Sequence, residues 1–514
     1  MLSVLLFIPL VGALGISLWP RRWPSQQVWW FALGAQALSL VWAIALAAQF
    51  DIQQPSLQFV ESLPWIDSLG LTYQLGIDGL SLPLLVVNSL LGLIAVYASP
   101  VEIQRNRLYF SLLLLINFAV AGAFVAQNLL LFFLFYELEL IPLYLLIAIW
   151  GGSRRGYAAT KFLIYTATSG ALILGAFLGL AWLGVADSFN YDPAIAQSLT
   201  LVQQSLLLIA ILIGFGIKVP LFPFHTWLPD AHVEASTPVS VLLAGVLLKL
   251  GTYGIVRFGL QLFPEAWHAF APWLAGWAVM SVLYGSLAAI AQQDMKKMVA
   301  YSSIGHMGYI LLAAAATTPL AVLGTIMQMV SHGLISGLLF LLVGVVYAKT
   351  GTRDLTVLRG LLNPERGLPL IGSLMILGVM ASAGTPGMVG FISEFIVFRA
   401  GFAVFPIQTL LCMVGSGLTA VYFLLLMNRA FFGRLAVTVP QDTVAADIIL
   451  PPVAWRDRAP AMVLAVIIVA LGLQPSWLIR LSEATTLAMR SPTTEIAQQP
   501  EKLPAPDLNY PAVL

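Results

Sequence analysis

The sequence predicts an all-α polytopic membrane protein with about fourteen transmembrane helices. Hydrophobic residues make up 60% of the 514-residue chain and charged residues only 9%, and the mean hydropathy is +0.92. A soluble domain has about 25% charged residues, so this composition excludes an ordinary soluble protein. The apolar residues are also gathered in runs of about 20, which is the length of helix that crosses a bilayer.

The predicted spans follow these apolar runs in order along the chain. The first run has no basic residue before it, and Arg21 and Arg22 follow it, so we interpret it as a retained helix and not as a signal peptide. The fourteen spans lie at about 2–19, 28–49, 80–98, 108–126, 129–150, 162–185, 201–218, 239–256, 270–291, 298–316, 320–347, 369–398, 405–426 and 461–479.

Two further segments lack the pattern of a span. Residues 53–78 are acidic, alternate in polarity and contain glycines, which predicts a short external hairpin between the second and third helices. Residues after 491 are rich in Pro, Glu and Gln, which predicts either an extended arm over a neighbouring subunit or a disordered tail. Leu508, Tyr510 and Val513 could be buried against a neighbour and favour the arm.

The lysine and arginine residues gather on one side of the predicted bundle. Even-numbered connections contain only Arg257 and Arg399, so the positive-inside rule places the odd-numbered loops in the cytoplasm and both termini on the lumenal side. Lys218 and Lys249 are then the only basic residues within predicted spans, which makes them candidate functional residues. The odd-numbered connections contain Arg21, Arg22, Arg105, Arg107, Arg154, Arg155, Lys161, Lys296, Lys297, Lys349, Arg353, Arg359, Arg366, Arg429, Arg434, Arg456 and Arg458.

Proline and glycine interrupt two of the spans beside an ionisable residue. Pro220 and Pro223 follow Lys218, and Gly384 and Pro386 precede Glu394. Lipid cannot replace the backbone hydrogen bonds lost at such breaks, and a broken helix beside an ionisable group is typical of an ion or proton path.

The spacing of the two breaks predicts an internal repeat. They lie five helices apart, which predicts two inverted five-helix repeats with broken helices 7 and 12. The expected units are 1–107 with the first three helices and the hairpin, 108–260 and 261–435 with the two repeats, and 436–514 with the last helix and the tail.

Two carboxylates and two lysines are candidate proton carriers. Glu137 and Glu139 point about 200° apart on a regular helix, so we expect them at different sites. Charges about 8 Å apart at an effective dielectric of about 20 interact by about 2 kcal/mol, so movement of Glu137 relative to Lys218 could switch the proton affinity of the lysine. The alternatives are a carboxylate that only tethers helices, which fits Glu139 better than Glu137, and a lysine that stays paired and never titrates.

His306 and His332 lie on polar stripes of successive helices. Hydroxyl, amide and imidazole groups at this spacing can hold water and relay protons, although a lone histidine in a membrane protein is often only a packed core residue. The stripes consist of Ser302, Ser303, His306 and Tyr309 in one helix and of Gln328, His332 and Ser336 in the next.

The use of cysteine limits the redox chemistry of the chain. Cys412 is the single cysteine, which excludes a disulfide framework, a cysteine-ligated iron-sulfur cluster and a thiolate zinc site within this chain. No glycine-rich phosphate loop follows a strand pattern. We therefore predict no metal and no cofactor in this chain, and any redox cofactor would belong to partner subunits.

Five motifs in one order carry a family resemblance that covers about residues 70–435. They resemble the antiporter-like chain 4 of respiratory complex I and of its photosynthetic relatives, the type-1 NAD(P)H dehydrogenase complexes. The motifs are FYELELIPLY at 135–144, KVPLFPFHTWLPDAH at 218–232, LLKLGTYG at 247–254, AYSSIGHMG at 300–308 and GFISEF at 390–395.

The resemblance implies a non-redox, proton-translocating subunit in the membrane arm of an NAD(P)H or ferredoxin:plastoquinone oxidoreductase. It implies that flavin or iron-sulfur centres and plastoquinone are held by partner subunits. The implied partners are a chain-5-type antiporter-like subunit, small hydrophobic subunits and a hydrophilic redox arm. The proton path carried over from the family consists of Glu137, Lys218, Lys249 and Glu394, with His306 and His332 as relays.

Glu139 departs from the bacterial respiratory pattern and resembles the plastid and cyanobacterial form, which implies a thylakoid membrane. Residues 420–435, AVYFLLLMNRAFFGRL, resemble variants from carbon dioxide uptake complexes, whose partners include a carbonic-anhydrase-like hydration module. Two alternatives remain. A subunit of a multisubunit sodium/proton antiporter has similar motifs without redox chemistry, and a transport-inactive scaffold would use its buried charges only to select neighbouring subunits.

Overall fold

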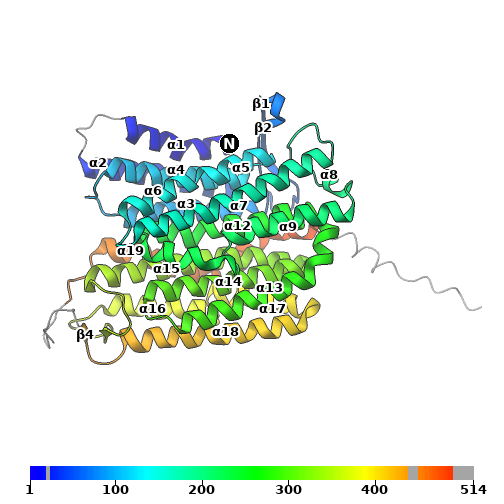
Figure 1. Ribbon diagram of the computed structural model, residues 1–514. Coiled ribbons are helices and arrows are strands. Elements are labelled where there is room, and N and C mark those ends of the chain that lie inside the picture. Colours follow the sequence, from blue (N-terminus) through cyan, green and yellow to red (C-terminus); the bar gives the residue numbers. More distant parts are fainter. Residues whose placement is uncertain (19–23, 438–449, 490–514) are drawn as a thin grey trace, which may run out of the picture.

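Long apolar segments form long helices that run side by side (Figure 1). The computed structural model describes residues 1–18, 24–437 and 450–489. The predicted tail, together with Arg21 and Arg22, lies outside the described residues. The helices are α1 (Leu2–Leu18), α2 (Ser25–Gln49), α3 (Ser81–Ala98), α4 (Asn106–Val125), α5 (Leu129–Leu138), α6 (Leu140–Trp150), α7 (Arg155–Leu183), α8 (Pro193–Gln197), α9 (Leu201–Lys218), α10 (Trp227–Glu234), α11 (Thr237–Leu242), α12 (Leu248–Gly254), α13 (Pro264–Ile290), α14 (Met295–Ala316), α15 (Pro319–Thr350), α16 (Pro369–Ser382), α17 (Val389–Val404), α18 (Pro406–Leu426), α19 (Trp455–Leu473) and α20 (Ser476–Ala488).

Short irregular helices and two strand pairs complete the described part of the chain. The π-helical segments are η3 (Leu243–Leu247), η4 (Ile255–Leu260) and η5 (Met427–Phe431), and the 3-10 turns are η1 (Asp67–Leu69) and η2 (Phe224–Thr226). The strands are β1 (Gln58–Ile66), β2 (Leu71–Ile77), β3 (Leu358–Arg359) and β4 (Ala436–Val437), which form two antiparallel pairs.

The predicted all-α membrane fold is confirmed. Among the described residues, eleven helices are long and apolar enough to cross a membrane, or twelve when the bent pair α19 and α20 counts as one span. Each of the fourteen predicted segments coincides with one helix or with consecutive helices, although α1 and α16 are shorter than a full span. The number fourteen and the inverted repeat stay predictions.

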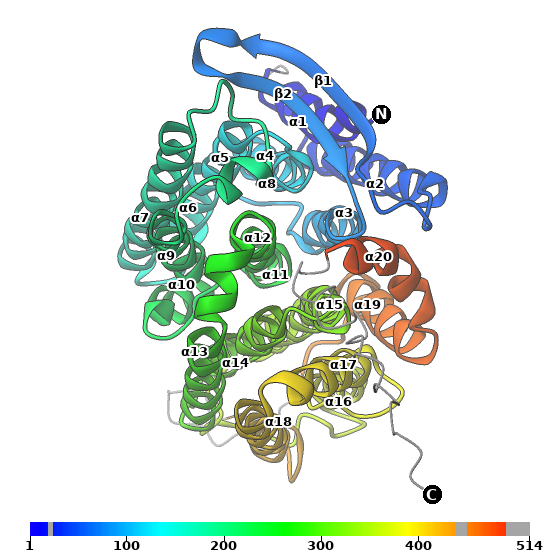
Figure 2. The ribbon, with the colours of Figure 1, turned by 90° about the vertical axis from the view of Figure 1, so that its right-hand side faces the viewer.

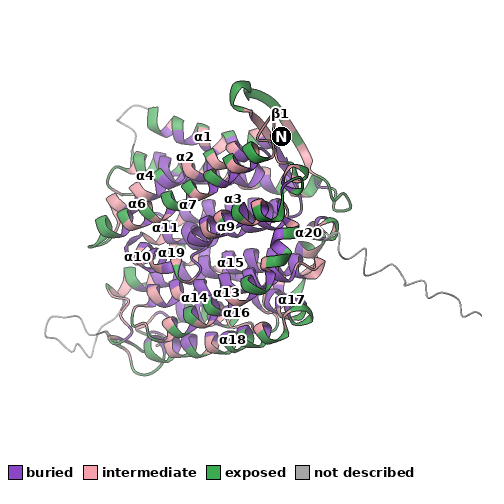
Figure 3. Cartoon of the chain, turned by 45° about the vertical axis from the view of Figure 1, so that its right-hand side comes forward, coloured by how far each residue is buried: buried purple, intermediate pink, exposed green. Residues whose placement is uncertain are grey.

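The interior of the bundle is formed by the helices that carry the polar groups. Viewed along the helix axes, α11, α12 and α15 lie between the earlier helices and α16 to α18 (Figure 2). The most apolar stretch of Thr237–Leu260 is completely buried. Exposed large apolar side chains instead face outward on α1, α2, α7, α13 and α18 (Figure 3). An apolar exterior around a buried polar interior is the arrangement that a bilayer requires.

The predicted hairpin is also confirmed, with Leu63 of β1 opposite Tyr73 of β2. It is fastened to α1 through Glu61, whose carboxylate pairs with the Met1 ammonium and accepts hydrogen bonds from the Leu2 and Ser3 backbone N–H groups at 2.7 and 3.2 Å. Partial burial opposes ionisation of Glu61, but the hydrogen bonds from Met1 and Ser3 hold its pKa below the usual value.

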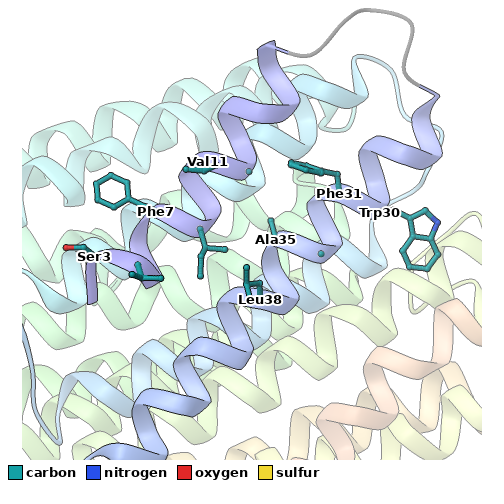
Figure 4. A pocket seen from close by; sticks show the side chains of 11 residues that line it. Ser3, Phe7, Val11, Trp30, Phe31, Ala35 and Leu38 are labelled. Atoms are coloured by element: carbon teal, nitrogen blue, oxygen red, sulfur yellow. The ribbon is translucent and has the colours of Figure 1, made fainter. Parts of the chain in front are cut away.

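An apolar groove of about 710 Å³ opens between α1 and α2 on the outer surface (Figure 4). Phe7 and Val11 of α1 and Trp30 and Leu38 of α2 line it. Its lining faces the region that lipid would occupy, and it contains none of the candidate proton carriers.

Glycine allows two interior helices to cross closely beside Lys249. A Cβ atom at Gly333 of α15 would lie 2.8 Å from the Gly245 carbonyl oxygen of η3 and 3.6 Å from Cε of Lys249. Because a backbone atom is the obstacle, the helices would have to move apart to admit a side chain. Glycine at this crossing therefore sets the distance between Lys249 and the α15 groups next to it.

We expect Gly333→Ala to destabilise the folded protein by about 1–3 kcal/mol, the usual cost of overpacking a close-packed core. Gly276→Ala is the matched control, because no atom lies within 4 Å of a Cβ built at that position of α13 and alanine is the better helix former. Thermal unfolding of the purified complex measures both effects. An unchanged midpoint for Gly333→Ala would show that the crossing is loose.

Candidate proton-transfer path

Lys218 lies at the C-terminal end of α9, where the chain leaves the helix. Pro220 and Pro223 have no N–H group, so the helix cannot continue through them, and a cation is favoured at a helix C-terminus. The Lys218 ammonium forms an ion pair with Glu139 and lies 4.5 Å from the centre of the Tyr136 ring. Both charged side chains are at most 2% exposed, so each neutralises a charge that would otherwise be buried alone.

Glu139 pairs with Lys218 at the junction between α5 and α6. Pro142 cannot donate to the Leu138 carbonyl, and α5 ends at Leu138 while α6 begins at Leu140. Glu137 lies instead against Gly170 of α7, and its Oε1 has no hydrogen-bond partner among the described residues. The carboxylate that forms the ion pair with Lys218 is therefore Glu139, and the sequence alone left this choice open.

Lys249 lies between the two π-helical segments of the buried span. Its ammonium donates to the Ala244 carbonyl of η3 and lies 2.6 Å from Nδ1 of His332. A charged lysine can only donate hydrogen bonds, whereas a neutral lysine can accept one from a protonated imidazole. One proton can thus lie on either side of this short contact.

The path continues from His332 to Glu394 through His306. The two imidazole rings lie 5.3 Å apart between centroids, and Nδ1 of His306 lies 3.6 Å from Oε1 of Glu394. A cavity of about 10 Å³ is bordered by all three side chains, which is about the space that one water molecule needs. Lys249, His332, His306 and Glu394 therefore form one contiguous row.

Hydroxyl and amide groups fix the orientation of this row. Nε2 of His306 lies 3.0 Å from the Ser382 hydroxyl, and Nδ1 lies 3.3 Å from the Gln328 amide nitrogen. The Ser416 hydroxyl donates to Oε2 of Glu394 at 2.9 Å. Ser382 is the last residue of α16, and the backbone turns there because Pro386 lacks the N–H that would bond to its carbonyl.

The two parts of the path are joined by close packing of α9 against α12. A Cβ atom at Gly251 would lie 3.3 Å from Cβ of Lys218 and 3.2 Å from the Val219 backbone nitrogen. Gly251 is two residues after Lys249, so the absence of a side chain at this position brings the two lysine-bearing helices together.

Two buried cations were not expected from the sequence, namely Lys296, which lies in the span Met295–Ala316, and Arg257. Arg257 lies in η4, inside the span Thr237–Leu260, and is 5% exposed. The expectation that it belongs to an even-numbered loop, and that Lys218 and Lys249 are the only basic residues within spans, is wrong. The helix continues four residues beyond the predicted end, and Arg257 pairs there with Asp78 at 2.6 Å. Arg257 follows Tyr253 by four residues and Lys249 by eight. This spacing places the three residues on one face of a helix and could have indicated that Arg257 is buried.

The comparisons with known proteins identify the family. Residues 126–419, which include every candidate residue of the path, match the model of the NADH:quinone oxidoreductase/Mrp antiporter transmembrane family. The chain is 41% identical to NAD(P)H-quinone oxidoreductase chain 4 1 of Synechococcus sp. (strain JA-2-3B'a(2-13)), covering 97% of this chain and 95% of that relative. The chain belongs to the NADH:quinone oxidoreductase/Mrp antiporter family.

Other family members agree with this assignment. NAD(P)H-quinone oxidoreductase chain 4 2 of Thermosynechococcus vestitus is 40% identical over 95% of this chain and 91% of the relative. A chain of respiratory complex I from Thermus thermophilus is 25% identical, with a TM-score of 0.83, and the match covers 95% of this chain and 99% of that one. A chain of the Mrp complex from Dietzia sp. has a TM-score of 0.84 at 23% identity, covers 96% and 99%, and shows the likeness of fold.

This family member holds its titratable groups without a metal cluster in the part of the chain that the structure describes. No group of three or more His, Cys, Asp or Glu side chains lies close enough there to hold a metal ion. Imidazole, ammonium and carboxyl groups in contact can transfer protons without such an ion.

We expect Glu139→Gln to destabilise the protein more than Glu137→Gln, by about 3–5 kcal/mol, because it leaves the Lys218 ammonium buried without its carboxylate. Thermal unfolding of the assembled complex measures the difference. Adding Lys218→Met to Glu139→Gln should restore most of the stability, since an apolar residue needs no counter-charge. Equal effects of the two glutamate variants would contradict the pairing.

Proposed function

We propose that this chain is a proton-translocating subunit in the membrane arm of an NAD(P)H or ferredoxin:plastoquinone oxidoreductase. Quinone reduction by partner subunits drives protons through the buried row in this chain. The observation that carries the proposal is the contiguous row from Lys249 through His332 and His306 to Glu394. The names of the curated relatives, which are chain 4 subunits of NAD(P)H-quinone oxidoreductases, support the choice of complex.

The row supplies a sequence of proton transfers between groups that touch or nearly touch. A proton on Lys249 passes to Nδ1 of His332 along their 2.6 Å contact. It then crosses the small cavity to His306 and Glu394, where the 3.6 Å separation of the ion-pairing atoms requires a small movement or a water molecule. Lys218 and Glu139 form the other charged end, and Glu137 lies beside them as a second carboxylate.

The driving force comes from outside this chain. Moving one proton against about 100 mV requires about 2.3 kcal/mol, and the row has no reaction of its own to provide it. Flavin or iron-sulfur centres and plastoquinone would be held by the hydrophilic redox arm and its neighbours. A chain-5-type antiporter-like subunit and small hydrophobic subunits would adjoin this chain in the membrane.

The cyanobacterial origin of the relatives also supports a location in the thylakoid membrane. The distribution of lysine and arginine supports an orientation with the odd-numbered loops cytoplasmic and both termini lumenal. The segment 420–435 favours the form of the complex that serves carbon dioxide uptake and carries a carbonic-anhydrase-like module. The second candidate function is that of a sodium/proton antiporter subunit, which the fold of the Mrp complex favours.

We expect Lys249→Met to reduce coupled proton transfer by tenfold or more while the complex still assembles, because methionine removes the proton shared with His332. Proton uptake per electron, measured with the intact complex in sealed vesicles, tests this. Lys297→Met is the control, since Lys297 is half-buried at the start of α14 and outside the row. Full pumping by assembled Lys249→Met complex would favour the transport-inactive scaffold.

Partner identity separates the redox subunit from the antiporter subunit. We expect native mass spectrometry of the complex purified through this chain to find subunits with flavin or iron-sulfur centres and a quinone-binding subunit. Sodium/proton exchange by a complex that reproducibly lacks such subunits would support the antiporter instead. A bound zinc-containing hydration module would identify the carbon dioxide uptake form.

A further inference from the structure

A polar cavity of about 410 Å³ opens at the end of the bundle where the β1–β2 hairpin lies, which we call the hairpin-end vestibule. Ser56, Gln197 and Ala488 at its mouth are exposed, whereas Asp78 and Arg257 at its inner wall are buried. The exposed mouth and polar lining make this cavity accessible to water. It contains none of the six candidate proton carriers.

Asp78 and Arg257 form a hydrogen-bonded ion pair at the inner wall of the vestibule. The Arg257 guanidinium donates to Oδ2 of Asp78 at 2.6 Å and to Oε1 of Gln261 at 3.0 Å. The other carboxylate oxygen of Asp78 accepts the backbone N–H groups of Leu80 and Ser81 at 3.1 and 3.0 Å. Both oxygens of the carboxylate are therefore already bonded to donors.

The Tyr253 hydroxyl lies next to this ion pair. The Tyr253 hydroxyl accepts from Nε of Arg257 at 3.2 Å and donates to the Phe124 carbonyl at 3.3 Å. Lys249 precedes Tyr253 by four residues, so both lie on the same face of α12. Arg257 lies about 12 Å from Lys249 along the helix axis. The vestibule thus reaches within three turns of Lys249.

We propose that the Asp78–Arg257 ion pair is a proton barrier that seals the row from the hairpin-end vestibule. The inference rests on the proposed function, because a seal is needed only where Lys249 exchanges protons. In this role the two residues prevent protons from leaking between the row and the water and hydronium in the vestibule.

The direction of the hydrogen bonds explains how the barrier works. A proton moves along a chain of groups only when each can accept one proton and release another. The guanidinium has five N–H donors and no acceptor, and it does not lose its proton in proteins. Asp78 has its oxygens occupied, and the Tyr253 proton points to a backbone carbonyl. A fixed arginine is also an electrostatic obstacle to protons in membrane pores.

The test is passive proton leak through the intact complex in sealed vesicles, with a potassium diffusion potential imposed and no electron donor present. We expect Asp78→Asn with Arg257→Gln to raise the proton leak tenfold or more, because neutral amides can accept as well as donate. Adding Lys249→Met to this double variant should return the leak to the wild-type value. Asp294→Asn with Arg353→Gln is the matched control, since it removes an Arg–Asp ion pair of similar length, 2.7 Å against 2.6 Å, that lies outside the row.

Arg257→Gln alone should leak, and Arg257→Lys should leak as well, because a desolvated lysine can lose the proton that a guanidinium keeps. These two single substitutions test the barrier if the double variant does not assemble. The proposal is overturned if an assembled Arg257→Gln complex does not leak protons. It is also overturned if adding Lys249→Met leaves the proton leak of the double variant unchanged. Failure of the proposed function is distinct, because it would appear as normal pumping by Lys249→Met alone.

Discussion

The need to solvate charges inside an apolar bundle determines where this structure departs from regular helix. A charge buried without a partner costs several kcal/mol, and a regular helix uses its own backbone carbonyls internally. Glu139 lies between α5 and α6, Lys218 lies at the end of α9, and Lys249 donates to a carbonyl of η3. In each case the irregular backbone places an opposite charge or a carbonyl beside the charged group.

The two ends of the proton path use different electrostatics. Lys218 and Glu139 are complementary charges in contact, so the proton distribution there is held by a full ion pair. From His332 onward the groups are imidazole, hydroxyl, amide and carboxyl, which can be neutral and can exchange roles as donor and acceptor. The close packing of α9 against α12 at Gly251 lies between these two ends.

The sequence predicts the fold and most of the path because each depends on local composition. Apolar runs locate the helices, and the prolines near Lys218 and Glu394 locate the breaks. The four-residue spacing of Gln328, His332 and Ser336 indicates one polar face. The partner of Lys218 could not be predicted this way, because a regular helix places Glu137 and Glu139 about 200° apart but does not say which of the two faces meets Lys218.

The pairing of Arg257 with Asp78 joins distant parts of the chain and also could not be predicted from the sequence. An arginine near the end of an apolar run looks like a loop residue until an acid 179 positions earlier is known to lie beside it. The contacts of Ser382 with His306 and of Ser416 with Glu394 could not be predicted for the same reason, since each serine comes from another helix. Helical periodicity indicates a face but cannot say which residue from elsewhere meets it.

The buried lysines and Arg257 differ in whether the side chain can release its proton. Lysine can lose its proton when it is desolvated, whereas the arginine guanidinium remains protonated in proteins. The chain has lysine at Lys218 and Lys249, where a proton carrier is proposed, and arginine at Arg257, where the helix meets the vestibule. A single helical face thus contains a group that can release a proton and, two turns further on, one that keeps its proton beside a carboxylate.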